Sequence, residues 1–101
     1  MVLVKIYSVY RNVIAICDSD LIGRKLEDSD GKKALDLTGN FFKGEELDDE
    51  RVIEIMKDGY IEDATFNIVG KKSCSLAKRI GLIREGGIIY VEDVPVALVL
   101  I

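Results

Sequence analysis

Short apolar runs separated by turn residues constrain the fold of this chain more than any other feature. Runs rich in β-branched and aromatic residues predict strands at 2–9, 13–17, 34–37, 60–69, 87–91 and 96–101. Two other segments, 48–58 and 71–80, carry apolar residues at helical spacing. We therefore expect one α+β domain over residues 1–101, with a mainly antiparallel or mixed sheet of about five to six strands and two main helices packed on it.

The first two runs are expected to form a hairpin that turns at Arg11-Asn12 and pairs Tyr10 with Val13. This register gives two apolar faces, one with Ile6, Ala15 and Cys17 and the other with Tyr7, Val9, Ile14 and Ile16. We therefore expect the hairpin to be buried on both sides.

Turn and cap residues set the other predicted boundaries. Asp48 is a candidate N-cap for the first helix, which should stop at Gly59, and a strand should follow over 60–69. The second helix should follow Gly70 and close at Gly81. Residues 18–33 are expected to form a loop with one helical turn at 19–23. The last two strands should turn at Glu92-Asp93, with Pro95 at a strand start or an edge.

Composition excludes several classes of protein. Hydrophobic residues make up 49% of the chain and charged residues 32%, as in a folded soluble protein, and no apolar run approaches the ~20 residues of a membrane span. The N-terminus does not resemble a signal peptide, so we expect a cytoplasmic protein without membrane association. Cys17 and Cys74 should then be buried thiols. The chain has no histidine, which excludes His-dependent catalysis and His-ligated metal sites.

The net charge of −4 hides a strongly uneven distribution. Residues 18–63 hold fifteen acids and seven bases, a difference of −8, whereas residues 64–84 hold five bases and no acid. Such a division can steer an anionic partner to one surface of a protein.

The basic segment contains the strongest candidate site. In the helix at 71–80, one face carries the cations and a serine, while the opposite face is apolar. Lysines at the start of a helix oppose its dipole, which suggests that they serve another purpose than helix stability. Together with the first backbone N–H groups, they could hold a phosphate. The candidate anion- or RNA-binding residues are Gly70, Lys71, Lys72, Ser75, Lys78 and Arg79. The alternative is a solvated helix face.

Other motifs are weaker. Gly70-Lys-Lys-Ser73 lacks the spacing of a P-loop, and the Asp18 and Asp28 loops lack oxygen ligands where a calcium loop needs them. Cys17 lies beside an acid, which disfavours a reactive thiolate. Phe41 and Phe42 could stack on a base or a partner side chain, or else close the end of a core. We expect no catalytic residue, no metal site and no cofactor.

Several short motifs occur in one order along nearly the whole chain: Cys17-Asp18, Leu21-Ile-Gly-Arg-Lys25, Phe41-Phe-Lys-Gly-Glu45, Asn67-Ile-Val-Gly70, Gly81-Leu-Ile83 and Val94-Pro-Val-Ala97. In this the chain resembles the archaeal family known as domain of unknown function 424. The resemblance implies a cytoplasmic archaeal protein of α+β build and brings no established activity. Family members often have histidine where this chain has Val96.

Three functional hypotheses follow, in order of preference. The first is a non-enzymatic module that docks its basic helix on RNA, in translation or on the ribosome, although the pI of about 4.8 is low for such a protein. The second is a protein–protein adaptor or a homodimer, in which this helix meets an acidic surface such as residues 45–54 of another copy. The third is an enzyme that acts through carboxylates and lysines.

Overall fold

A six-stranded mixed sheet forms the centre of the computed structural model, which describes residues 1–8 and 10–100. Its strands are β1 (Val2–Ser8), β2 (Asn12–Asp18), β5 (Glu45–Leu47), β6 (Thr65–Val69), β7 (Ile88–Val91) and β8 (Val94–Val99). They lie in the order β5-β1-β2-β6-β8-β7, in which β2 and β6 are parallel and the other neighbours antiparallel. The predicted α+β class and mixed sheet are confirmed.

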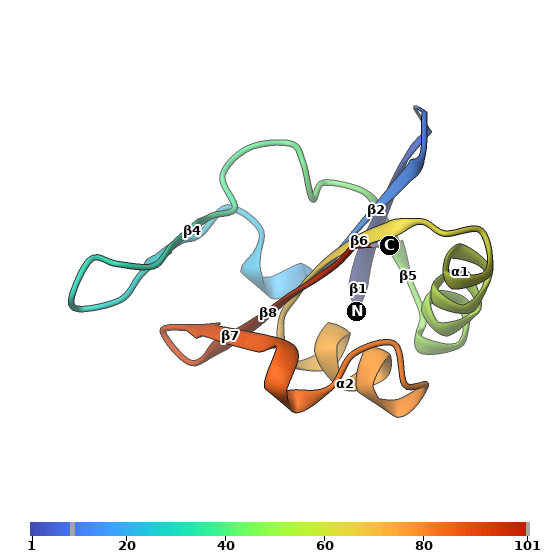
Figure 1. The fold of residues 1–101 in the computed structure, drawn as a ribbon. Helices are drawn as coiled ribbons and strands as arrows, with labels where there is room; N and C mark the ends of the chain where they lie inside the picture. Colours follow the sequence, from blue (N-terminus) through green and yellow to red (C-terminus); the bar gives the residue numbers. More distant parts are fainter. Residues whose placement is uncertain (9, 101) are drawn as a thin grey trace.

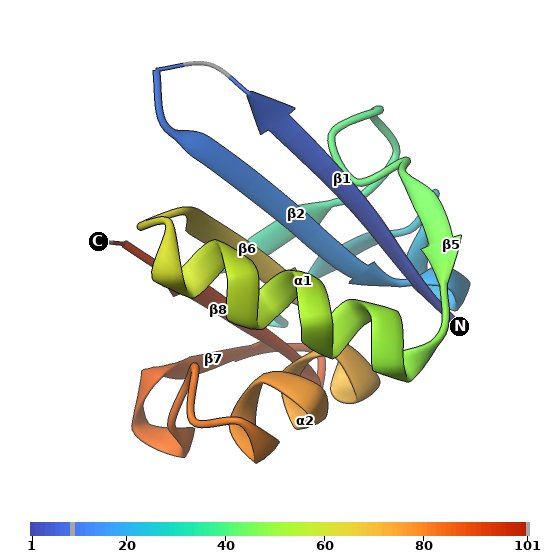
Figure 2. The same cartoon turned by 90° about the vertical axis from the view of Figure 1, so that its right-hand side faces the viewer.

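Two helices cover one face of this sheet, α1 (Asp49–Ile61) and α2 (Lys71–Arg79). Figure 2 shows α1 lying along the sheet with α2 beside it. The apolar stripes of both helices meet the sheet in the main core, where Val52 and Leu76 pack with Ile16 and Phe66. Two short 3₁₀ helices, η1 (Ser19–Leu21) and η2 (Glu85–Gly87), complete the helical part.

The opposite face of the sheet is covered in part by the long connection between β2 and β5 (Figure 1). This connection holds a separate two-stranded sheet of β3 (Lys25–Glu27) and β4 (Ala34–Asp36). Leu37 and Phe42 pack from it onto Ala15 and Cys17 of β2 in a second core. The prediction that the hairpin is buried on both sides is confirmed for residues 14–17 of β2 and is wrong for the end of β1, where Ile6 and Ser8 are exposed.

The hairpin register differs from the prediction. Tyr7, not Tyr10, pairs with Val13, and Asn12 is already in β2, opposite Ser8. Because the shift is by an odd number of residues, Tyr7 moves to the face of Ala15, and Ile6 moves to the face of Ile14, where it is half exposed. The observed register places Val2 and Val4 in the main core, which explains why the hairpin adopts it instead of the predicted register. The predicted positions of Val9 and Ile101 lie outside the described residues.

The first helix does not stop at Gly59, and the strand predicted at 60–69 begins only at Thr65. Gly59 is a packing residue inside α1. A Cβ there would lie 2.6 Å from Cδ1 of Ile14 and 2.8 Å from Cζ of Phe66. Glycine thus allows the helix to approach the sheet closely, and α1 continues for two more residues.

Several local predictions are confirmed. The side chain of Asp48 accepts the N–H of Arg51 at 2.9 Å and caps α1. Glu92 and Asp93 form the last turn, both at positive φ, and Pro95 is the second residue of β8. The short strands β3 and β5 were not predicted.

Within the described residues, neither helix has the length and apolar character to cross a lipid bilayer.

Candidate functional site

The N-terminal end of α2 is held by a carboxylate from the end of β2. Asp18 accepts the backbone N–H of Lys72 at 3.0 Å and that of Ser73 at 2.8 Å, as well as the Ser73 hydroxyl at 2.6 Å. Both side chains are buried, with 9% of Asp18 exposed and none of Ser73. These charge-assisted bonds satisfy N–H groups that have no partner within the helix.

Gly70 makes this contact possible. Its φ of 113° lies in the region that disfavours side chains, and a Cβ would lie 2.2 Å from Cγ of Asp18. We predicted that Gly70 and the first N–H groups could hold a phosphate. The structure places the chain's own Asp18 carboxylate there, so these two N–H groups are not open to an external anion.

The orientation of α2 is as predicted. Its apolar side chains Cys74, Leu76 and Ala77 are buried, while the cations and Ser75 are exposed. Gly81 ends the helix at a φ of 79°, where the N–H groups of Gly81 and Leu82 bond the carbonyls of Lys78 and Ala77. We call the exposed set Lys71, Lys72, Ser75, Lys78 and Arg79 the basic face.

Two of the four cations of the basic face have carboxylate partners. Lys72 Nζ lies 3.1 Å from Oδ1 of Asp49, at the start of α1. Lys78 Nζ lies 3.0 Å from Oε1 of Glu85, which raises the pKa of Lys78 and contributes to the lowered pKa of Glu85. Among the residues that the structure describes, no carboxylate lies within ion-pair distance of Lys71 or Arg79. The basic face therefore keeps a positive charge.

Two surface hollows flank the basic face, and Lys71 lines both. One, of about 360 Å³, also has Arg24 and Lys72 beside Asp18 and Asp20. The other, of about 280 Å³, is lined by Lys71, Cys74, Ser75, Lys78, Ile88, Tyr90 and Pro95. Arg24 and Tyr90 were not predicted as site residues, because only the folded topology brings the β2–β3 loop and β7 beside α2.

The two predicted aromatic residues behave differently from each other. Phe42 is buried in the second core and is not available to stack on a ligand, which corrects that prediction. Phe41 is 43% exposed and stacks on Tyr7 with ring centroids 5.1 Å apart. Figure 1 shows this loop on the opposite side of the sheet from α2, so the structure does not bring Phe41 or Phe42 to the basic face.

Both cysteines are free and buried, as predicted. Burial, together with the charge of Asp18, raises the pKa of each thiol to about 12. Each is therefore a neutral thiol at physiological pH and a poor nucleophile. Cys17 and Cys74 act as core residues.

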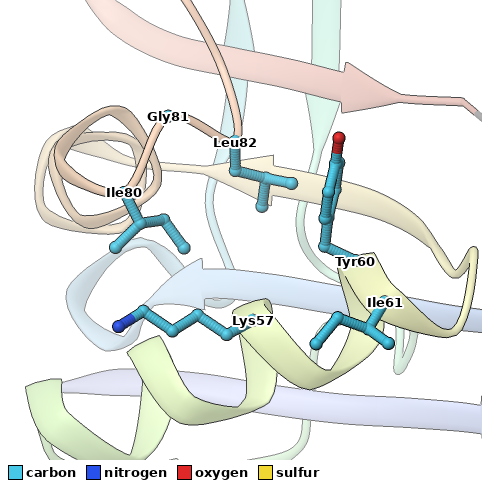
Figure 3. Close-up of a pocket in the computed structure, with 6 residues that line it drawn as sticks. All are labelled: Lys57, Tyr60, Ile61, Ile80, Gly81 and Leu82. Carbon is cyan, nitrogen blue, oxygen red and sulfur yellow. The ribbon is translucent and has the colours of Figure 1, made fainter.

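A further hollow, of about 350 Å³, lies between the ends of the two helices (Figure 3). Lys57, Tyr60 and Ile61 come from α1, and Ile80, Gly81 and Leu82 come from the end of α2 and the turn after it. Tyr60 is 59% exposed and Ile61 78%. The lining is mostly apolar, which suits an apolar group better than an anion.

Comparison with known proteins identifies the family and the fold. The family model described as protein of unknown function (DUF424) matches residues 7–101. The structure is similar to the crystal structure of an uncharacterized conserved protein from Methanopyrus kandleri, with a TM-score of 0.80 and 26% sequence identity. That similarity covers 96% of this chain and 88% of the other. The comparison with curated proteins gave no match.

Proposed function

This chain belongs to the DUF424 family of proteins of unknown function, and we propose that it is a non-enzymatic module that docks on RNA through the basic face of α2, in translation or on the ribosome. The observation that carries the proposal is the outward position of Lys71, Lys72, Lys78 and Arg79 on one short helix. Cations in such an array can each neutralise a backbone phosphate.

The two ion pairs on the basic face do not prevent its lysines from binding phosphates. Lys72–Asp49 and Lys78–Glu85 join side chains that are about half exposed, and exposed pairs of this kind contribute little to stability. A phosphate can replace either carboxylate as the partner at small cost. Lys71 and Arg79 are outside these pairs, and Arg24 adds a further guanidinium in the hollow next to Lys71.

The low pI does not oppose the proposal, because only a few of the eighteen acids adjoin the basic face, among them Asp49 and Glu85, which pair with Lys72 and Lys78. The segment 64–84, which contains α2, carries no acid at all. At physiological ionic strength, charges more than about 8 Å apart are largely screened from each other. Local charge on the basic face therefore matters more for binding than the net charge of −4.

Charge reversal tests the proposal. Lys71→Glu with Arg79→Glu removes the two unpaired cations and leaves both ion pairs in place. We expect RNA binding, measured by fluorescence anisotropy with a labelled oligoribonucleotide, to be lost. The matched control is Lys32→Glu with Lys33→Glu, which makes the same charge change at the exposed turn between β3 and β4. Equal loss in both variants, or none in the first, would contradict docking through α2.

A second candidate is a homodimer. The Lys72–Asp49 pair shows that the basic face adjoins the acidic start of α1 in one molecule. Two copies related by a two-fold axis could therefore pair these surfaces reciprocally. Light scattering after gel filtration tests this: a nuclease-treated dimer that dissociates on Glu45→Lys with Glu46→Lys supports it, and a monomer contradicts it.

A further inference from the structure

We propose that the RNA bound by the basic face is single-stranded and that Tyr90 stacks on one of its bases. This inference rests on the proposed function and names its ligand more narrowly. It places the aromatic contact at β7, beside α2, instead of at the Phe41-Phe42 loop on the other side of the sheet.

The position of Tyr90 carries the argument. Its side chain is 43% exposed and lines the same hollow as Lys71, Ser75 and Lys78. Tyr90 lies on the edge strand β7, opposite Pro95 of β8, which lines that hollow too. An exposed ring beside two lysines is the combination with which proteins hold single-stranded nucleic acids, as the ring accepts a base and the cations follow the phosphates.

The hydroxyl group of Tyr90 is already engaged. It donates to Oε2 of Glu85 at 2.5 Å, while Oε1 of the same carboxylate accepts Lys78 Nζ at 3.0 Å. The polar tip of the ring is thereby tied to the end of α2, which limits the rotamers open to the side chain. A ring that is ordered before binding loses less entropy when a base stacks on it.

The geometry favours a single strand over a duplex. In an RNA helix the bases are stacked on each other and their faces are not available to a protein ring. The hollow beside Tyr90 is shallow enough to be open to solvent, and its volume of about 280 Å³ can take one unstacked base. Ser75 and Lys71 then lie on the α2 side of the same hollow, where they can contact a neighbouring phosphate.

Two Tyr90 variants distinguish stacking by the ring from the hydrogen bond that its hydroxyl group makes to Glu85. Tyr90→Phe keeps the ring and loses the bond to Glu85, whereas Tyr90→Ala loses both. With a labelled single strand of about 12 nucleotides, we expect Tyr90→Phe to bind slightly more weakly than the parent, because its ring is no longer held by Glu85, and Tyr90→Ala to bind about 5- to 100-fold more weakly. Tyr60→Ala, at a similarly exposed tyrosine away from the basic face, should bind like the parent. The same strand annealed to its complement should bind the parent more weakly.

Each outcome bears on one claim. If Tyr90→Ala binds like the parent while Lys71→Glu with Arg79→Glu does not bind, the stacking role is overturned and the basic face stands. Equal or tighter binding of the duplex overturns the single-strand preference. If the parent protein binds neither RNA, the proposed function itself fails. Thermal melting of each variant shows whether its fold is intact.

Discussion

The buried carboxylate of Asp18 accepts both the backbone N–H and the hydroxyl group of Ser73, at 2.8 and 2.6 Å. Asp18 ends a strand and Ser73 lies in the first turn of α2, so this contact joins the sheet to the helix that carries the basic face. It also compensates for the first turn of α2, which has no acidic residue to match the helix dipole. Asp18 therefore orients the helix that carries the basic face.

Replacing the Asp18 carboxylate should destabilise the fold. Asp18→Asn keeps the shape but turns an acceptor of the Lys72 or Ser73 N–H into a donor. We expect the free energy of unfolding in urea to fall by about 1–3 kcal/mol. Asp20→Asn is the control, because Asp20 is exposed in the same loop and should change stability little. A similar loss in both variants would show that Asp18 has no special role.

Gly70 and Gly81 offer a matched pair of substitutions at the two ends of α2. Both have positive φ, so alanine is strained at either: by about 1 kcal/mol at Gly81, and by more at Gly70, whose φ of 113° and ψ of 157° lie in a region that essentially only glycine adopts. A Cβ at Gly81 meets open space, whereas one at Gly70 lies 2.2 Å from the Asp18 carboxyl carbon. We therefore expect Gly70→Ala to lower the free energy of unfolding by at least about 2 kcal/mol more than Gly81→Ala does. Equal losses would contradict both the greater backbone strain at Gly70 and its close approach to Asp18.

The two cysteines should be protected from thiol reagents in the folded protein. Burial raises the pKa of Cys17 and of Cys74 to about 12, from an ordinary value of 9.0. At neutral pH we expect almost no reaction with a chromogenic disulfide reagent until denaturant is added, when both thiols should react. Rapid labelling of either thiol in native buffer would contradict the structure. The neutral thiols also favour the folded state below pH 9, and this contribution is lost as the pH rises toward 12.

The Tyr90–Glu85–Lys78 group predicts a pH dependence with a definite sign. The hydrogen bond to Glu85 raises the pKa of Tyr90 above 10.0, and those from Tyr90 and Lys78 lower the pKa of Glu85 below 4.5. The Tyr90 contribution to stability is therefore complete below pH 10 and lost as the pH rises through the raised pKa. The Glu85 contribution is present above pH 4.5 and lost as the pH falls through the lowered pKa.

Glu85→Gln tests this group. An ultraviolet titration of the tyrosines should show one phenol that ionises at lower pH in the variant than in the parent. Tyr60→Phe serves as the control. It removes a different tyrosine, so the Tyr90–Glu85 bond and the late ionisation of Tyr90 should remain. An unchanged titration curve in Glu85→Gln would contradict the hydrogen bond.

The sequence correctly predicted those features that are determined by residues within the element itself. The cap at Asp48, the closing Gly81 and the two faces of α2 follow from side-chain type and spacing, and each is present. Gly59 failed as a stop signal because its role is set by Ile14 and Phe66, which are distant in sequence. The hairpin register failed for a similar reason, since packing of Val2 and Val4 under the helices outweighs the turn residues.

The candidate site was predicted in part. The basic face follows from helical spacing alone, whereas Arg24 and Tyr90 reach it only through the fold. One missed signal was nevertheless present in the sequence. A helix that starts after glycine with two lysines and no acid leaves its N–H groups without a local acceptor, which indicates that a residue elsewhere must supply one. Asp18 is that residue.

The salt dependence of RNA affinity tests the central claim most directly. If the cations of the basic face neutralise about three to four phosphates, a logarithmic plot of the association constant against salt concentration has a slope of roughly −2 to −3 for a single strand. In Lys71→Glu with Arg79→Glu, binding should be too weak to measure at about 100 mM salt, while Lys32→Glu with Lys33→Glu keeps the parent's slope. No binding by the parent at about 50 mM salt, or a slope near zero, would contradict the account.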